Sequence, residues 1–390
     1  MMSEKKAQYK ILSIDGGGIR GIIPLRVLIE FELRTGKPIS ELFDFITGVS
    51  VGSIIAAGLT LKEDPNNSQD NTPVKSAVGL LKDFINLGEK IFPSSSVFND
   101  IYSYRYTKHN SENYKMLLDD YLGDYKLADT IIPIACTSLS LNTSLPYTWS
   151  TYKAKINPDQ NYYLKDAILA SSAAPTFFSA YKAVAPDKNN TITYHVDGGL
   201  VNNNPFLDGV TEFIEYHGKK GAKTPIGKEN IFAVSIGTGS FNYISDKSIE
   251  KLIDAGKIQW MSNQPNVLDF MFNANSASTN KKAKFLFGEN FYRFQIKLPT
   301  KHAELDNTNT DNICGILFLM ERFILENDSK INEVLKHLDK DFNSTSYQRK
   351  GNFNFDIICK DYVNSFKSDN KENINTFRLD NEEEVCYETV

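Results

Sequence analysis

Cysteine is scarce in this sequence, and the few cysteines are far apart. There are four in 390 residues, they form no C-x-x-C pair, and they are too sparse for a disulfide-stabilised scaffold. We therefore expect reduced thiols. The four residues are Cys136, Cys314, Cys359 and Cys386.

An excess of basic charge is also absent. Lysine and arginine together number 43, against 48 aspartate and glutamate residues, which leaves a net charge of -5. The chain has no basic run of the kind that follows a nucleic-acid backbone. The composition therefore argues against nucleic acid as a partner.

Long apolar runs are missing as well. The longest, IIAA and ILFLM, are far too short to cross a bilayer. The first residues, MMSEKKAQYK, are charged and polar where a secretory signal peptide needs an apolar segment. The pattern predicts a soluble, cytoplasmic protein, although export by a route that uses no such signal would leave no trace in it.

Strand-like and helix-like segments alternate through the first half of the chain, which predicts an α/β fold with a mainly parallel central sheet. YKILSI is expected to form a buried strand, and apolar residues recur every three or four positions over residues 22–34, which predicts a helix. LFDFITG predicts a second strand, which runs into the helical segment VSVGSIIAAG. Further strands are expected in IIPIACTSL, ITYHVDGG, IFAVSIGTGS and FYRFQIKL, and further helices over residues 77–90 and 267–284.

The pattern changes beyond residue 300. Residues 311–342 have helical periodicity, with CGILFLMERFIL as the apolar face, and the end of the chain is rich in Asn, Lys and Asp. We therefore predict a main domain over residues 8–300, which carries the motifs described next. A helical extension that ends in a polar tail is expected over residues 301–390.

A glycine-rich turn follows the first predicted strand. Residues 15–21 read DGGGIRG, and the glycines satisfy the G-x-G-x-x-G dinucleotide fingerprint. Gly16, Gly17 and Gly18 could equally present bare N–H groups to an oxyanion. A dinucleotide site needs an acid at the end of the second strand to hold a ribose hydroxyl, and Ser50 occupies that place instead. The sequence thus favours an oxyanion hole.

Ser50 lies in a G-x-S-x-G pentapeptide between a predicted strand and a predicted helix. Small residues on both sides let the backbone turn sharply and expose the serine hydroxyl, as in a nucleophile elbow. A helix N-terminus also favours the negative charge that develops there. Ser50 is therefore the candidate nucleophile, and the alternative is a serine that caps a helix between two turn glycines.

A serine nucleophile needs a base, and the segment YHVDGGLVNNNP offers two candidates. Asp197 ends a predicted strand ahead of two glycines, and it can act directly if burial brings its pKa towards the working pH. His195 lies on the same strand face, which leaves open a Ser-His-Asp triad of the α/β-hydrolase type with His195 or His217 as base. A non-catalytic protein that binds a nucleotide at the glycine loop is a third alternative.

Taken together, these motifs resemble the patatin family of acyl hydrolases. The family motifs D-G-G-G-x-R-G, G-x-S-x-G and D-G-G occur in order at residues 15–21, 48–52 and 197–199. The segments LVNNNP, ASSAAPTFF and VSIGTG also resemble family segments, so the likeness covers residues 10–239. Three ordered motifs are far more specific than any one of them.

The resemblance implies a patatin-like three-layer α/β/α fold and hydrolysis of fatty acyl esters, especially those of phospholipids and lysophospholipids, in a phospholipase A2-like reaction. It implies a serine–aspartate dyad in which Ser50 forms an acyl-enzyme and Asp197 is the base, with the three glycines as oxyanion hole. Arg20 would shape the glycine loop or meet a substrate phosphate, and Asp15 would order the turn. No metal and no other cofactor is implied.

A lipid substrate requires an apolar site and access to a membrane or micelle surface, so we expect transient peripheral contact with such a surface. KIFPSSSVFNDIYSYRY (residues 90–106) and PTFFSAY (residues 175–181) place aromatic residues beside proline and serine outside any periodic pattern. Such loops can line an acyl site or dip into an interface, and Phe98 is the candidate in the first of them. Ordinary loop packing is the alternative.

Overall fold

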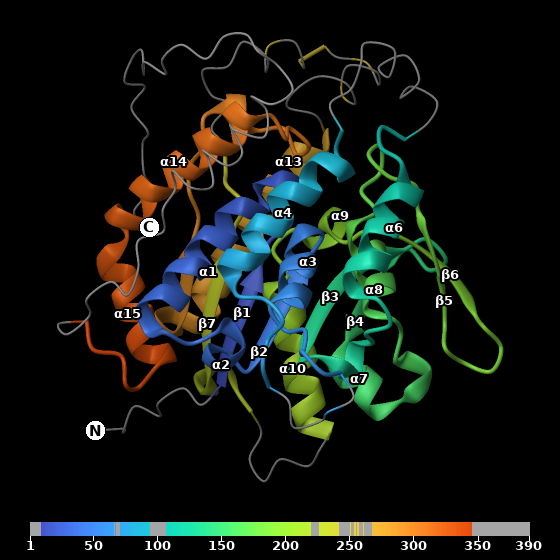
Figure 1. The fold of residues 1–390 in the computed structure, drawn as a ribbon, viewed down its shortest axis with the longest axis horizontal. Helices are drawn as coiled ribbons and strands as arrows, with labels where there is room; N and C mark the ends of the chain where they lie inside the picture. Colours follow the sequence, from blue (N-terminus) through green and yellow to red (C-terminus); the bar gives the residue numbers. More distant parts are fainter. Residues whose placement is uncertain are drawn as a thin grey trace.

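The structure of this chain, a computed structural model, is an α/β fold built on one central sheet (Figure 1). It describes residues 9–344, apart from residues 66, 68–70, 94–106, 220–225, 242–249, 251–252, 255, 257–259 and 261–266. Most of the aromatic segment that contains Phe98, and the polar tail with Cys359 and Cys386, lie outside the described residues.

The central sheet has eight strands in the described part of the chain. They are β1 (Tyr9–Ile14), β2 (Phe45–Val49), β3 (Ile134–Ser140), β4 (Leu145–Ser150), β5 (Tyr181–Val184), β6 (Ile192–Asp197), β7 (Ile231–Ile236) and β8 (Phe291–Phe294). Their order is β5-β6-β3-β2-β1-β7-β8, with β4 also paired to β3. Because β1, β2, β3, β7 and β8 are parallel, the predicted mainly parallel sheet is confirmed.

Strands β4 and β5 are not predicted by the sequence pattern. The first of these, LPYTWS, begins with an exposed leucine and proline, and the second, YKAV, is only 4 residues long. Neither has the apolar run of a buried strand, so both depend on their antiparallel pairing with β3 and β6.

Helices cover both faces of the sheet (Figure 1). They are α1 (Ile22–Thr35), α2 (Ile39–Leu42), α3 (Val51–Gly58), α4 (Ala77–Ile91), α6 (Ser111–Leu122), α7 (Thr151–Ile156), α8 (Leu164–Ser172), α9 (Gly199–Asn202), α10 (Phe206–Lys219), α13 (Val267–Phe287), α14 (Thr310–Glu326) and α15 (Asp328–Leu338). Along β1, Leu12 and Ile14 join the core that contains α1, α3, α4 and α8, whereas Ile11 faces α10 and the end of α13. The predicted three-layer α/β/α architecture is therefore confirmed.

Strand β3 joins two strands at one of its edges. Its other edge is occupied by β4 along most of its length. The first part of β3 pairs in parallel with β2, where Thr137 lies opposite Val49. The last part pairs antiparallel with β6, where Ser138 lies opposite Asp197. The carboxyl ends of β2 and β6 therefore meet at consecutive positions of β3.

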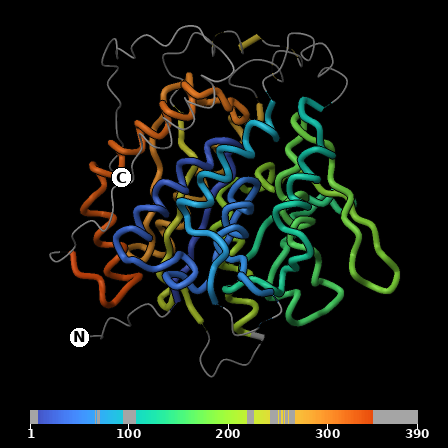
Figure 2. The backbone as a smooth tube through the Cα atoms, in the orientation of Figure 1, coloured from blue at the N-terminus to red at the C-terminus, as the bar shows by residue number. Residues whose placement is uncertain are grey.

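The helices α14 and α15 lie beside α1, although they are far from it in the sequence (Figures 1 and 2). Ile316, Leu317 and Met320 of α14 are fully buried in the core that also holds Leu25 and Ile29 of α1. The helical pattern expected after residue 300 is confirmed, and these helices share the core of the preceding residues. The division of the chain at residue 300 stays a prediction.

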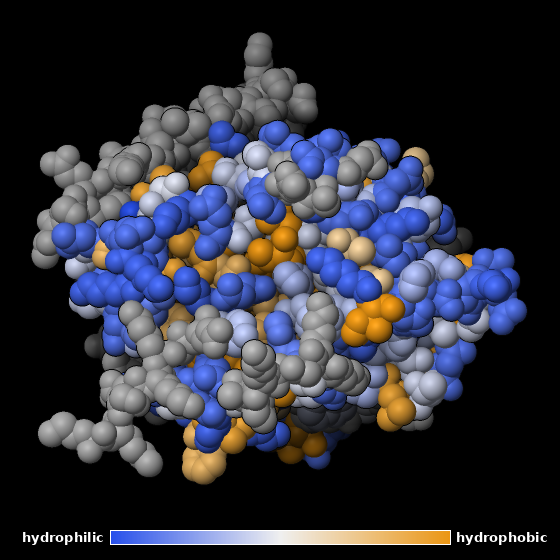
Figure 3. Space-filling view, turned by 90° about the horizontal axis from the view of Figure 1, so that it is seen from below, coloured by the Kyte–Doolittle hydropathy of each residue, from blue (hydrophilic) through white to orange (hydrophobic). Residues whose placement is uncertain are grey.

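The underside of the molecule, where α2 leads into β2, is covered mostly by hydrophilic side chains, with apolar side chains in several separate groups (Figure 3).

Within the described ranges, no helix combines the length and the apolar character that a membrane span requires.

A buried cluster of charges connects α1 with α14. The guanidinium of Arg26 is fully buried and contacts Glu30 at 3.0 Å and Glu321 of α14 at 2.5 Å. Arg34 completes the cluster through a 2.8 Å contact with Glu30. Because Glu30 is itself only 1% exposed, its charge depends on these two arginines for compensation.

We expect Arg26→Met to lower the free energy of unfolding by about 3 kcal/mol, because it leaves a buried carboxylate with one partner fewer. The matched control is Arg322→Met, which removes an exposed pair with Glu326 within α14 and should cost less than about 1 kcal/mol. Urea denaturation of both variants measures the difference. Equal effects would show that the buried cluster does not hold α14 in place.

Candidate active site

Ser50 lies on a sharp turn between β2 and α3. Its backbone has φ 53° and ψ -125°, a left-handed conformation that non-glycine residues rarely adopt. A Cβ on Gly48 would come within 2.2 Å of the Gly52 carbonyl oxygen, and one on Gly52 within 2.2 Å of the Ile14 carbonyl oxygen. Both glycines are therefore required because the turn packs against itself and against β1, which is the geometry of a nucleophile elbow.

Ser171, at the end of α8, holds this turn. Its hydroxyl accepts a hydrogen bond from the N–H of Ser50 at 3.0 Å and donates one to the carbonyl of Thr137 at 2.7 Å. The segment ASSAAPTFF had suggested a family likeness but no role for this serine. The structure shows that it connects the nucleophile turn to β3.

Asp197 ends β6 and is 2% exposed. The hydroxyl of Ser50 interacts with its carboxylate and favours the ionised form, and the N–H of Gly199 donates a hydrogen bond to it at 2.7 Å. Burial raises the pKa of Asp197 from 3.8 to about 6, and the interactions with Gly199 and Ser50 oppose this increase only in part. The structure thus brings the two predicted residues together, with a carboxylate whose pKa lies near the pH at which a general base works.

The glycine loop offers two free amides to the same space. The N–H of Gly16 donates to the carbonyl of Asn203 at 3.1 Å and is therefore occupied. Gly17 and Gly18 line the pocket beside Ser50, and their N–H groups have no acceptor among the described residues. Of the three glycines that the sequence suggested for an oxyanion hole, only these two have N–H groups that remain available.

Arg20 lies behind the loop rather than in the pocket. It is 4% exposed, its main-chain N–H donates to the Gly17 carbonyl at 3.1 Å, and its Nε lies 3.4 Å from the same oxygen. Its guanidinium stacks on the ring of Phe241, with 4.8 Å between the guanidinium carbon and the ring centroid. These contacts favour the loop-shaping role over contact with a substrate phosphate.

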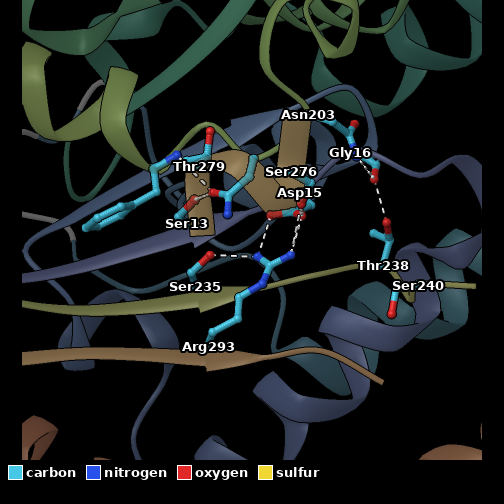
Figure 4. A network of polar contacts seen from close by, with 12 residues as sticks. Ser13, Asp15, Gly16, Asn203, Ser235, Thr238, Ser240, Ser276, Thr279 and Arg293 are labelled. Atoms are coloured by element: carbon cyan, nitrogen blue, oxygen red, sulfur yellow. Dashed lines mark hydrogen bonds and ion pairs between the residues drawn. The ribbon is translucent and has the colours of Figure 1, made fainter. Parts of the chain in front are cut away.

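Asp15 is the centre of a buried polar network beneath the loop (Figure 4). Arg293 of β8 contacts its two carboxylate oxygens at 2.7 and 2.5 Å, and Ser276 of α13 donates to it at 2.7 Å. Arg293 also donates to Ser235 of β7 at 2.7 Å. Asp15 therefore has the structural position expected of it, whereas Arg293 was missed because the strand pattern of FYRFQIKL assigns this arginine no role.

The two histidines considered for a triad lie elsewhere. His195 is fully buried, and its ring nitrogens contact the hydroxyls of Ser138 and Thr193, both at 2.9 Å. Burial lowers the pKa of His195 to about 4. His217 packs against aromatic rings, among them that of Phe213 at 4.4 Å between centroids. Neither histidine lines the pocket that Ser50 shares with Asp197.

An apolar pocket of about 640 Å³, including its open mouth, ends at the two predicted catalytic residues. PTFFSAY contributes Phe177 and Phe178, as expected for a loop that lines an acyl site. Nothing among the described residues forms a cluster of acidic, histidine or cysteine side chains that could hold a metal ion. The remaining lining residues include Val51, Ile54, Phe84, Ile91, Phe92, Tyr114, Ser172, Asn203, Phe272 and Leu305.

Relatives of this chain share most of its length. Patatin-like protein 2 of Oryza sativa subsp. indica is 28% identical over 365 residues, which cover 86% of this chain and 88% of that protein. Patatin-like protein 2 of Arabidopsis thaliana is 30% identical over 285 residues, 68% of this chain and 69% of that protein. A protein named probable inactive patatin-like protein 9, also from Arabidopsis thaliana, is 29% identical over 250 residues, 60% of this chain and 62% of that protein.

The family model described as patatin-like phospholipase matches residues 12–209, which is just over half of the chain and includes all three motifs. The fold and the identity to several relatives agree with this match. The chain therefore belongs to the patatin-like phospholipase family, a membership that implies lipid acyl hydrolase activity.

Proposed function

We propose that this protein is a lipid acyl hydrolase of the phospholipase A or lysophospholipase type, that Ser50 is its nucleophile and that Asp197 is its base. The observation that carries the proposal is the interaction of the partly buried Ser50 hydroxyl with the buried carboxylate of Asp197 at the end of an apolar pocket. Such a pair needs no third residue, because a carboxylate with a pKa of about 6 is ionised at neutral pH and can accept the serine proton directly.

In the first half of the proposed reaction, the Oγ of Ser50 bonds to the acyl carbonyl carbon while its proton passes to the carboxylate of Asp197. The carbonyl oxygen becomes an oxyanion, which the N–H groups of Gly17 and Gly18 stabilise. The bond to the glycerol oxygen then breaks, and Asp197 returns the proton to that oxygen. The products are a lysolipid, or a glycerol derivative, and an acyl ester on Ser50.

In the second half, a water molecule attacks the acyl-enzyme and gives its proton to Asp197. The second tetrahedral intermediate uses the same two N–H groups. When the bond between the acyl carbon and Oγ breaks, the proton returns from Asp197 to Ser50, and the fatty acid leaves. The reaction balances without a metal or other cofactor, because one carboxylate accepts and returns each proton.

The lining of the pocket supports an acyl-chain substrate. Its walls are mainly aromatic and aliphatic side chains, with few polar groups among them. The proposal includes transient contact with a membrane or micelle, since the substrate must leave a lipid surface to reach Ser50. It also includes the cytoplasmic location expected from the sequence.

We expect Ser50→Ala and Asp197→Asn each to lower ester turnover by about 10⁴-fold or more, since each removes a member of a cooperating pair. A phospholipid panel with distinguishable labels on the two acyl positions measures turnover and positional preference together. His195→Gln and His217→Gln are the controls, and both should keep turnover within about tenfold of the parent. Loss of turnover in either histidine variant, with the fold intact, would favour a triad.

The pH dependence of kcat/KM reports the base in the free enzyme. Because Asp197 must be ionised to accept the proton and its pKa is raised to about 6, we expect kcat/KM to rise tenfold per pH unit below that value and to level off above it. A profile between pH 4.5 and 8 on a soluble short-chain ester measures the inflection. An inflection near 4 would show that burial does not tune this carboxylate.

The carboxylate of Asp197 should also make stability depend on pH. As the pH rises, we expect kcat/KM to increase and the free energy of unfolding to decrease. Its pKa is higher in the folded than in the unfolded chain, so its contribution to stability is complete below pH 3.8 and is lost as the pH rises through about 6. At pH 8 the buried charge costs about 3 kcal/mol. We therefore expect Asp197→Asn to raise the free energy of unfolding by about 1–3 kcal/mol at pH 8 and to change it little at pH 4. Urea denaturation at both pH values tests this, and a less stable variant at pH 8 would contradict it.

A further inference from the structure

Two side chains from distant parts of the sequence hold the carbonyl of Gly16. The hydroxyl of Thr238 donates to this oxygen at 2.5 Å, and Nδ2 of Asn203 donates to it at 3.2 Å (Figure 4). Thr238 follows β7 in the segment VSIGTG, and Asn203 follows α9 in LVNNNP. Both segments carried a family likeness, but the proposed reaction assigns no step to either residue.

The direction of this carbonyl fixes the direction of the next amide. A peptide group is planar and trans, so its C=O and N–H point in opposite directions. With the Gly16 oxygen held towards Thr238, the N–H of Gly17 must point away from Thr238. The next peptide repeats the arrangement, because the Gly17 carbonyl accepts from the main chain of Arg20 and the Gly18 N–H points the other way. The directions of the Gly17 and Gly18 N–H groups are thus set by the hydrogen bonds that the carbonyl oxygens of Gly16 and Gly17 accept.

We propose that Thr238 and Asn203 are positioning residues that aim the Gly17 N–H at the developing oxyanion. This inference rests on the proposed function, because it concerns the same acyl transfer. Thr238 acts from behind the loop, since it is 2% exposed and does not line the pocket. It holds the peptide through a bond that is already formed before substrate binds.

Thr238 and Asn203 can hold the Gly16 carbonyl only because residues 16 and 17 are glycines. A Cβ on Gly17 would lie 2.2 Å from Oγ1 of Thr238, and one on Gly16 would lie 2.4 Å from Oδ1 of Asn203. Only a chain without side chains at these positions lets the donors approach the Gly16 carbonyl so closely. The three-glycine motif is therefore explained by what lies behind the loop as well as by what lies in front of it.

Asn203 also links the loop to the base. Its own N–H donates to Oδ1 of Asn275 on α13 at 2.8 Å, and Nδ2 of Asn275 donates to the carbonyl of Gly199 at 2.9 Å. Gly199 in turn donates to Asp197. A short chain of hydrogen bonds thus sets the oxyanion donors and the carboxylate relative to each other.

The test compares Thr238→Val, which has the same shape without the hydroxyl, with Thr238→Ser, which keeps the hydroxyl. Loss of one oxyanion donor costs about 10²- to 10³-fold in rate, and a donor that is only misdirected should cost less. We expect Thr238→Val to lower kcat by about 10- to 100-fold while KM changes less than about threefold. Thr238→Ser should keep kcat within about threefold of the parent.

A second readout separates positioning from a general structural role. The readout uses an alkyl trifluoromethyl ketone as inhibitor. Oγ of Ser50 adds to its carbonyl carbon, and the resulting hemiketal carries an oxyanion that the N–H groups of Gly17 and Gly18 would bind. Its inhibition constant should rise in Thr238→Val by about the factor by which kcat falls, because both depend on the same donor. Thr60→Val is the matched control, since it removes an equally buried hydroxyl that donates to the main-chain carbonyl of Ala56 at 2.8 Å.

Unchanged kcat in Thr238→Val, or a lower kcat with unchanged ketone inhibition, would overturn the inference. An equal loss in Thr60→Val would do so too, since the effect would then be that of any buried hydroxyl. If Thr238→Val does not fold, Thr238→Ala replaces it in the same comparison with Thr238→Ser. Turnover that persists in Ser50→Ala would instead refute the proposed function itself, so the two failures are distinguishable.

Discussion

The register of β3 is the constraint on which the site depends. At one edge of this strand, Thr137 pairs with the last residue of β2 and Ser138 pairs with Asp197 of β6. The main chain turns out of β2 directly into Ser50, so the proposed nucleophile and Asp197 adjoin two neighbouring residue pairs of the sheet. A shift of one residue in the pairing of β6 would turn Asp197 to the opposite face of the sheet. The relative position of the two residues of the proposed dyad is thus set by backbone hydrogen bonds.

The site contains two features that are energetically unfavourable on their own, a rare backbone conformation and a buried carboxylate. Ser50 has a left-handed backbone, and Asp197 is a carboxylate in an apolar setting. The neighbouring groups are correspondingly well bonded, as Ser171 holds the serine turn and Arg293 neutralises Asp15 below the loop. The unfavourable features thus coincide with the two proposed catalytic residues, and the polar groups around them have hydrogen-bond partners.

Much of the site could be predicted from the sequence, because its chemistry depends on short contiguous motifs. The strand–glycine turn, the serine turn and Asp197 each have a local signature, and the parallel strands that feed them have apolar runs. What could not be predicted are the contacts made across the fold. The engagement of the Gly16 N–H by Asn203, and the placement of Arg293 under Asp15, depend on tertiary packing that leaves no periodic or local pattern. The same is true of β4 and β5, which form only through their partners.

The glycine loop is fixed at its far end by a hydrogen bond from the N–H of Ile19 to the carbonyl of Leu305. Leu305 also lines the pocket, as does Phe272. Both lie beyond residue 209, where the match to the family model ends. The three motifs therefore lie in one stretch of the chain, whereas part of the pocket wall is encoded in another. A substitution at Leu305 or Phe272 would therefore change the shape of this pocket without altering a motif residue.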